Sequence, residues 1–197
     1  MAIQHPLEVI LGAVSKTREL EARLERLEQQ LQLFKRVSRL MTRDLDLEAV
    51  LNEIVRLIRD FLECDSCLIY LVEDAELALS ASTEETRAKI GTVRLRLSEG
   101  LTGWVARERR LVAISREAYN DPRFKFFKDL PQDLFEAFLS VPIISQNKVV
   151  GVINVQHQAP RTHTGSDIEM ISTLGEQVGC LLVLSRQKSG AVLPAGV

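Results

Sequence analysis

The chain has 197 residues, of which 46% are hydrophobic and 26% charged, a composition typical of soluble globular proteins that excludes wholesale disorder and collagen-like repeats. With 25 Lys and Arg residues against 27 Asp and Glu residues, the net charge is −2, and the chain lacks the positive field that holds a nucleic acid backbone. We therefore expect no nucleic acid partner, and the length allows one ordinary domain with an appendage.

The chain is expected to be cytoplasmic. Its longest stretch without a charged residue, residues 149–160, is well short of the roughly 20 apolar residues that a membrane span needs. The N-terminus has no basic segment before a long apolar run, so a secretory signal is not indicated. Three cysteines are too few for a disulfide framework and fit reduced thiols. We expect no membrane partner.

The N-terminal segment has the heptad pattern of a coiled coil, with apolar residues at alternating steps of three and four from residue 10 to residue 45. They are Ile10, Ala13, Leu20, Leu24, Leu27, Leu31, Phe34, Met41 and Leu45, with Thr17 and Ser38 completing the series. In a parallel pair, Lys16 would face the partner's Glu21 and Arg23 the partner's Glu28. The pattern predicts that residues 1–45 form a dimerisation helix of a homodimer.

A second apolar stripe on the same segment leaves alternatives open. Leu33, Val37 and Leu40 lie on another face of the helix. The helix could therefore pack against its own domain, or the helices could form a larger bundle instead of a parallel pair.

Helical spacing resumes at residues 47–61, with Asp44 or Asp46 available to cap the first turn. Strand patterns follow at residues 66–72 and 76–81, which would form a hairpin, and at residues 92–97, where Arg and apolar residues alternate. A short helix is expected at residues 100–107 and a strand at residues 111–115. Residues 116–133 then form a long loop, and long loops in compact domains are often functional.

The C-terminal part contains the clearest hairpin, residues 138–145 and 149–157, joined by Gln146 and Asn147. The last helix begins at Thr164 with the capping-box acid Asp167, and is expected to end near residue 187. Because the strands come in hairpins, we expect an α+β fold, an antiparallel sheet of about six strands with its helices mainly on one face. The predicted domain covers residues 46–187, and residues 188–197 would be a flexible tail.

Several blocks of this sequence together resemble a GAF domain, the sensory module widespread in bacterial signalling proteins. They are EGLTGWVA (99–106), LVAIS (111–115), YNDPRF (119–124), FLSVPI (138–143), VGVINV (150–155) and TGSD (164–167). The resemblance covers about residues 40–186. Within the family, this sequence is similar to the GAF domains of nitrogen-fixation activators, nitrogen-type phosphotransferase enzyme I and sensor histidine kinases. It implies a regulatory domain that binds a small molecule, or only dimerises, and passes the change through flanking helices.

We expect the ligand site around the long loop, because seven of the ten aromatic residues fall between residues 104 and 138. Apolar contacts would come from Trp104, Phe124 and Phe138, and polar contacts from Tyr119, Asn120, Asp121 and Ser140. The resemblance places Tyr119, Asn120 and Asp121 in the loop that the family uses to cover its ligand. Plain packing is the competing interpretation and is preferred for Phe126 and Phe127. The sequence names neither a ligand nor a cofactor.

The C-x-x-C pair, Cys64 and Cys67, has the spacing of a redox pair or half a zinc site, but no second pair completes it. Two small hydrophobic side chains are the favoured interpretation. Some GAF proteins reduce free methionine sulfoxide with cysteines near the pocket, and residues 98–143 here contain no cysteine. This reductase function is the least favoured hypothesis.

His157, His163 and Asp167 could hold a metal ion, although helix capping by Asp167 is favoured. Of the motif in cyclic-nucleotide-binding GAF domains, only Asp167 is retained. Gly100 and Gly103 suggest either an anion site or a tight turn with close packing.

We recognise no arrangement of catalytic side chains in the sequence, so we expect a non-enzymatic signal-input module. Its partners would be a second copy, a small-molecule ligand, and a downstream signalling protein or a missing output domain. A purely structural dimerisation module without a ligand is the alternative.

Overall fold

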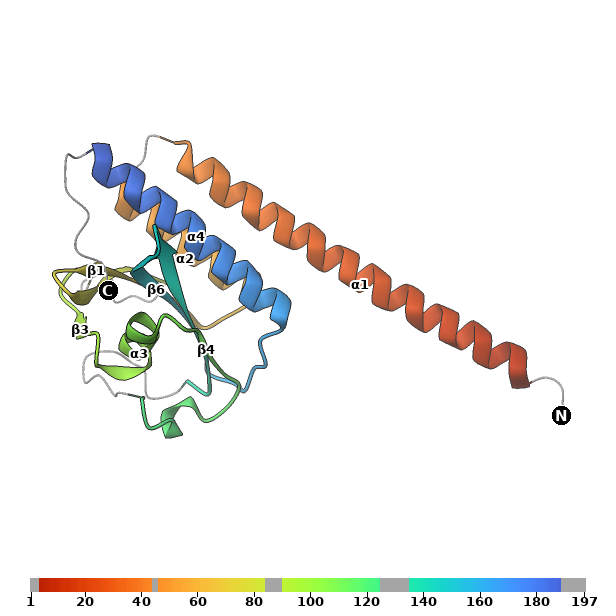
Figure 1. Ribbon diagram of the computed structural model, residues 1–197. Helices are drawn as coiled ribbons and strands as arrows, with labels where there is room; N and C mark the ends of the chain where they lie inside the picture. The colour runs from red at the N-terminus through yellow and green to blue at the C-terminus, as the bar shows by residue number, and fades with distance from the viewer. Residues whose placement is uncertain (1–3, 44–45, 84–89, 125–134, 189–197) are drawn as a thin grey trace.

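The computed structural model describes residues 4–43, 46–83, 90–124 and 135–188. The chain begins with two helices, α1 (Gln4–Met41) and α2 (Leu47–Leu62). Three strands follow, β1 (Ser66–Glu73), β2 (Glu76–Ser82) and β3 (Arg94–Arg96), and then helix α3 (Gly100–Glu108), strand β4 (Val112–Ile114) and the 3-10 turn η2 (Ala118–Asn120). Strands β5 (Ala137–Ser145) and β6 (Lys148–His157) and helix α4 (Gly165–Lys188) complete the chain (Figure 1). The predicted order of elements is confirmed, and the expected tail lies outside the described residues apart from its first residue.

The six strands form one antiparallel sheet in the order β3-β2-β1-β6-β5-β4. Two hairpins, β1–β2 and β5–β6, meet at the central pairing of β1 with β6. Their turns place Asp74, Ala75, Gln146 and Asn147 at positive φ angles between 48° and 64°. Two successive left-handed residues are what a tight hairpin turn requires. The predicted α+β fold with a sheet of about six strands is therefore confirmed.

Each face of the sheet carries its own hydrophobic cluster. Helices α2 and α4 cover one face, where Ile58, Ile153 and Val178 are buried. The shorter helix α3 covers the other face, where Tyr70 and Val152 are buried. The helices thus lie mainly on one face, as expected, and the sheet separates two cores.

Local contacts explain where the helices begin. The Asp46 carboxylate accepts a hydrogen bond from the backbone N–H of Ala49 at 2.6 Å and caps α2, while Asp44 lies outside the described residues. At the start of α3, Gly100 has a φ of +67°, and a Cβ on Gly103 would stand 2.6 Å from the carbonyl oxygen of Arg96. A tight turn and close packing therefore account for both glycines.

Helix α1 carries two apolar stripes with different environments. Leu33, Val37 and Leu40 are buried against α2 and α4, so the alternative of packing on its own domain holds for this stripe. The leucines of the predicted heptad seam remain 52% to 59% exposed: Leu20, Leu24, Leu27 and Leu31. Figure 1 shows the N-terminal half of α1 projecting clear of the domain. These four leucines are therefore exposed in the single chain, whereas Met41, near the end of the seam, packs against the core beneath α2 and α4.

Helix α4 is, by length and composition, apolar enough over residues 165–185 to cross a membrane, the one such helix among the described residues. Its apolar side chains are used in another way, because Ile171, Leu174, Val178 and Leu182 are buried in the cluster between the helices and the sheet. This is the packing of a core helix.

Candidate functional site

Alternation along the central strands brings polar side chains together on the face covered by α3. The hydrophobic cluster beneath α2 and α4 is called the helix-side cluster, and the one beneath α3 the α3-side cluster. In β6, Ile153 and Val155 belong to the helix-side cluster, so Asn154 and Gln156 point to the opposite face. The neutral polar side chains buried on this face include five that are no more than 7% exposed: Ser66 of β1, Thr102 of α3, Ser140 of β5, and Asn154 and Gln156 of β6. We refer to these five residues as the polar face.

Three members of the polar face form a hydrogen-bond network. The Ser140 hydroxyl donates to Oδ1 of Asn154 at 2.7 Å, and Nδ2 of Asn154 donates to Oγ1 of Thr102 at 2.8 Å. The network joins β5, β6 and α3. Because all three side chains are buried, the loss of any one would leave a buried group unpaired, at a cost of about 1–3 kcal/mol.

The other two members have unsatisfied polar atoms. Ser66 and Gln156 are directly paired positions on β1 and β6, and they are 0% and 1% exposed. Among the described residues, neither Ser66 Oγ nor Gln156 Oε1 has a hydrogen-bond partner. Buried polar groups are nearly always paired, so a partner from outside these residues is needed to satisfy them.

The loop expected to cover the ligand is held by its own polar contacts. The Tyr119 hydroxyl donates to a carboxylate oxygen of Glu136 at 3.3 Å. Asp121 accepts hydrogen bonds from the backbone and side chain of Arg123, which lower the pKa of its carboxyl below the usual range. The Arg123 guanidinium in turn lies 4.5 Å from the centre of the Trp104 ring. The start of the loop is thus tied to α3.

The seven predicted ligand contacts fall into two groups. Phe138 is buried and Phe124 and Trp104 are partly buried in the α3-side cluster, on the same face as Ser140. Tyr119 and Asp121 are half-buried and Asn120 is exposed at the rim. Residues 125–134 of the loop, including Phe126 and Phe127, lie outside the described residues.

Sequence reasoning missed four residues of the polar face, Ser66, Thr102, Asn154 and Gln156. A signal for two of them was present, because Asn154 and Gln156 are polar residues two apart within an otherwise apolar strand. Such spacing puts both on one face. Ser66 and Thr102 join them only through strand pairing and the position of α3, which local sequence does not encode.

The cysteines lie away from the polar face. Cys64 and Cys67 are buried in the helix-side cluster, and burial raises the pKa of the Cys64 thiol to about 12 and that of Cys67 well above its usual value. Cys180 is exposed on α4. Since thiolates are the reactive form, the C-x-x-C pair behaves as the small hydrophobic side chains favoured by the sequence.

His157 and His163 contact each other, and Asp167 lies near them but makes its hydrogen bonds to Thr164 and Arg26. The Nε2 atoms of the two histidines lie 3.2 Å apart, and burial followed by the neighbouring His163 lowers the pKa of His157 to about 4. Burial alone would raise the pKa of Asp167, but hydrogen bonds from Thr164 and Arg26 outweigh it and lower the pKa. Among the described residues, no three His, Cys, Asp or Glu side chains are grouped to hold a metal ion.

Asp167 also confirms the predicted capping box. Its carboxylate accepts from the Thr164 N–H at 2.9 Å, and its own N–H donates to Thr164 Oγ1 at 3.1 Å. The other oxygen of this carboxylate pairs with the Arg26 guanidinium of α1.

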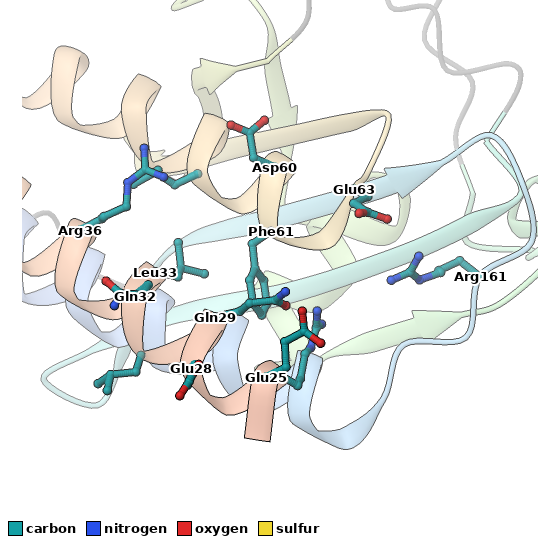
Figure 2. Close-up of a pocket in the computed structure, with 13 residues that line it drawn as sticks. Glu25, Glu28, Gln29, Gln32, Leu33, Arg36, Asp60, Phe61, Glu63 and Arg161 are labelled. Atoms are coloured by element: carbon teal, nitrogen blue, oxygen red, sulfur yellow. The ribbon is translucent and has the colours of Figure 1, made fainter. Parts of the chain in front are cut away.

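Two hollows lie beside α1 and away from the polar face. One, of about 790 Å³, lies between α1 and α2 and is lined by Phe61 and by charged residues that include Glu25, Asp60 and Arg161 (Figure 2). A second, of about 720 Å³, lies between α1 and the N-terminal part of α4. None of the seven predicted ligand contacts lines either hollow.

Comparison with known proteins agrees with this architecture. A curated relative, the Nif-specific regulatory protein of Azospirillum brasilense, is 27% identical over 157 residues, which are 76% of this chain and 25% of that protein. The chain thus spans about a quarter of the length of this relative. Among solved structures, the GAF domain of an Acinetobacter phosphoenolpyruvate-protein phosphotransferase has a TM-score of 0.72 and 26% identity, covering 82% of this chain and 97% of that one.

A more distant neighbour is an enzyme. The free methionine-R-sulfoxide reductase of Neisseria meningitidis has a TM-score of 0.67 and 17% identity, covering 83% of this chain and 91% of its own, a likeness of fold alone. The family model of the GAF domain matches residues 46–182, the part built around the six-stranded sheet. The chain belongs to the GAF domain family.

Proposed function

We propose that this protein is a non-enzymatic sensory module that binds a small molecule on the polar face and transmits the change through a dimer formed by α1. The observation that carries the proposal is that two buried atoms, Ser66 Oγ and Gln156 Oε1, have no hydrogen-bond partner in the part of the chain that the structure describes. A ligand that donates to the amide oxygen and exchanges a hydrogen bond with the hydroxyl would satisfy both. The regulatory name of the curated relative supports a signalling role.

The ligand would lie between the polar face and the covering loop. Trp104, Phe124 and Phe138 would contact its apolar part, while Ser140 and the rim residues Tyr119, Asn120 and Asp121 would contact its polar edges. The side chains of the polar face are neutral, so recognition there would depend on the matching of donors and acceptors. Analogues lacking one matching group should bind about 1–3 kcal/mol more weakly.

The two other functions have less support. A methionine sulfoxide reductase would need a reactive thiol near the ligand, whereas Cys64 and Cys67 lie in the helix-side cluster and Cys180 on the outer surface of α4. A purely structural dimerisation module has no use for core polar atoms that find no partner in the described segments. The small share of the relative that the chain covers favours a separate output domain or partner protein.

The test uses two matched variants, Gln156→Met and Gln177→Met. Both remove a buried amide oxygen that lacks a partner among the described residues, but Gln177 lies on α4. Native mass spectrometry of the purified protein would identify a retained molecule, and a thermal-shift screen of neutral and charged metabolites would find others. Ligand at a hundred times its Kd should stabilise the fold by about 2.7 kcal/mol.

Gln156→Met should abolish this stabilisation without lowering the Tm of the ligand-free protein, because it removes an unpaired group. Gln177→Met should retain it. A ligand that stabilises both variants equally would overturn the site, and the absence of any ligand in both assays would favour the structural module. Turnover of free methionine sulfoxide would overturn the non-enzymatic function.

A further inference from the structure

The stripe of α1 that contacts the domain changes character along its length. It follows steps of four, three, four and three through Arg26, Gln30, Leu33, Val37 and Leu40. The three apolar residues are at most 7% exposed and belong to the core. The first two residues are polar. The C-terminal part of α1 is therefore held by hydrophobic burial, and the part before it by polar contacts.

Side-chain contacts made by Arg26 and Gln30 hold this polar part. The Arg26 guanidinium pairs with Asp167 at the start of α4, whose side chain is only 3% exposed. The same guanidinium lies 4.3 Å from the centre of the Phe61 ring of α2. One turn further along α1, Nε2 of Gln30 donates to Oγ of Ser166 at 2.6 Å. Arg26 thus contacts both α2 and α4, the helices that cover one face of the sheet.

Hollows flank these contacts on both sides. Figure 2 shows Phe61 projecting from α2 into the hollow beside α1. The second hollow separates α1 from α4 around Arg23, Leu27 and Met170. Little close apolar packing supports α1 at this level, so its position depends on Arg26 and Gln30.

Asp167, which holds Arg26, is linked to the end of β6, the strand that contributes Asn154 and Gln156 to the polar face. Asp167 caps α4 together with Thr164. His163 directly precedes Thr164, and its ring contacts His157 at the end of β6. His157 comes directly after Gln156. A shift of this end of β6 would therefore move the carboxylate that holds α1.

We propose that Arg26 and Asp167 form a releasable clasp that sets the position of residues 20–31 of α1 relative to the domain. Released, this part of α1 pivots about the buried residues Leu33, Val37 and Leu40 while the core stays intact. The clasp deepens the proposed function, on which it rests, because it gives the ligand site a route to the dimer seam. A ligand acts on α1 only through different affinities for the clasped and released states.

The test measures the position of α1 in the full chain without any ligand. Nitroxide labels at Glu19 of α1 and Glu176 of α4, both exposed, report the distance within one chain by pulsed electron resonance after Cys180→Ser. An excess of unlabelled protein removes distances between subunits. The variants are Arg26→Ala and Asp167→Asn, which keeps an oxygen to cap α4. Arg18→Ala, at an exposed position about two turns away from Arg26, is the control.

The parent and Arg18→Ala should give one narrow distribution of distances. Arg26→Ala and Asp167→Asn should each broaden it at least twofold, with unchanged circular dichroism. Parent-like distributions in both variants would overturn the clasp. A change in Arg26→Ala alone would show that the contact with Phe61, not the ion pair, positions the helix, and would overturn it too. Ligand binding and light scattering are separate measurements, so the clasp and the proposed function can fail independently.

Discussion

Lysine at both Leu24 and Leu27 should separate the proposed dimer and leave the domain folded. The two leucines are 59% and 52% exposed in the single chain, so a partner helix would cover roughly half of each side chain. Full burial of a leucine is worth about 1.5–3 kcal/mol, which gives about 1 kcal/mol for each of the four side chains in a symmetric seam. The loss is about 3–6 kcal/mol, or two to four orders of magnitude in the dimer Kd.

Light scattering and sedimentation over nanomolar to micromolar concentrations would measure this change. The matched control is Gln29→Lys with Gln32→Lys, which adds the same two charges at exposed positions off the seam. The control should stay dimeric, and both proteins should keep the wild-type Tm of the domain extrapolated to low concentration. If Leu24→Lys with Leu27→Lys retains the wild-type dimer Kd, the exposed leucines are not the interface.

Three further predictions concern the fold. The pKa of His157 is about 4 in the folded protein against 6.5 ordinarily, so the unfolded chain takes up a proton first as the pH falls. The free energy of unfolding, measured with urea, should therefore be highest above pH 6.5 and decrease by up to about 3 kcal/mol towards pH 4. His157→Gln should reduce this pH dependence. Gly151→Ala should cost about 3 kcal/mol or more, since its Cβ would stand 2.4 Å from the Tyr70 carbonyl oxygen, whereas Gly165→Ala, with open space, should leave the Tm equal or higher. A thiol reagent should modify exposed Cys180 rapidly and Cys64 only on unfolding, and equal rates would contradict the burial of Cys64.

Patterns of short range were sufficient to predict most of the fold. The turn residues Gln146 and Asn147 and the capping box at Thr164 act on their immediate neighbours, so their structural effect can be read from the chain. The alternation of Arg94, Leu95 and Arg96 likewise predicted a half-buried strand, although the strand itself is only three residues long.

Contacts between distant parts of the chain were beyond such patterns. Ser66 meets Gln156 because β1 pairs with β6, and Arg26 meets Asp167 across 141 positions because α1 lies along α4. The heptad pattern predicted a seam on α1, but it could not decide which of two stripes would face the domain. That choice depends on the shape of the surface that α2 and α4 present.

The division of the sheet into two cores has a consequence for divergence within the family. Substitutions at Ser140, Asn154 or Gln156 change the face below α3, while the apolar cluster beneath α2 and α4 is built from the alternate residues of the same strands. Each strand therefore contributes one set of positions to the stability of the fold and another to the proposed ligand site. Descendants of such a domain can exchange one ligand for another, or lose ligand binding altogether, without rebuilding the surface on which α1 rests.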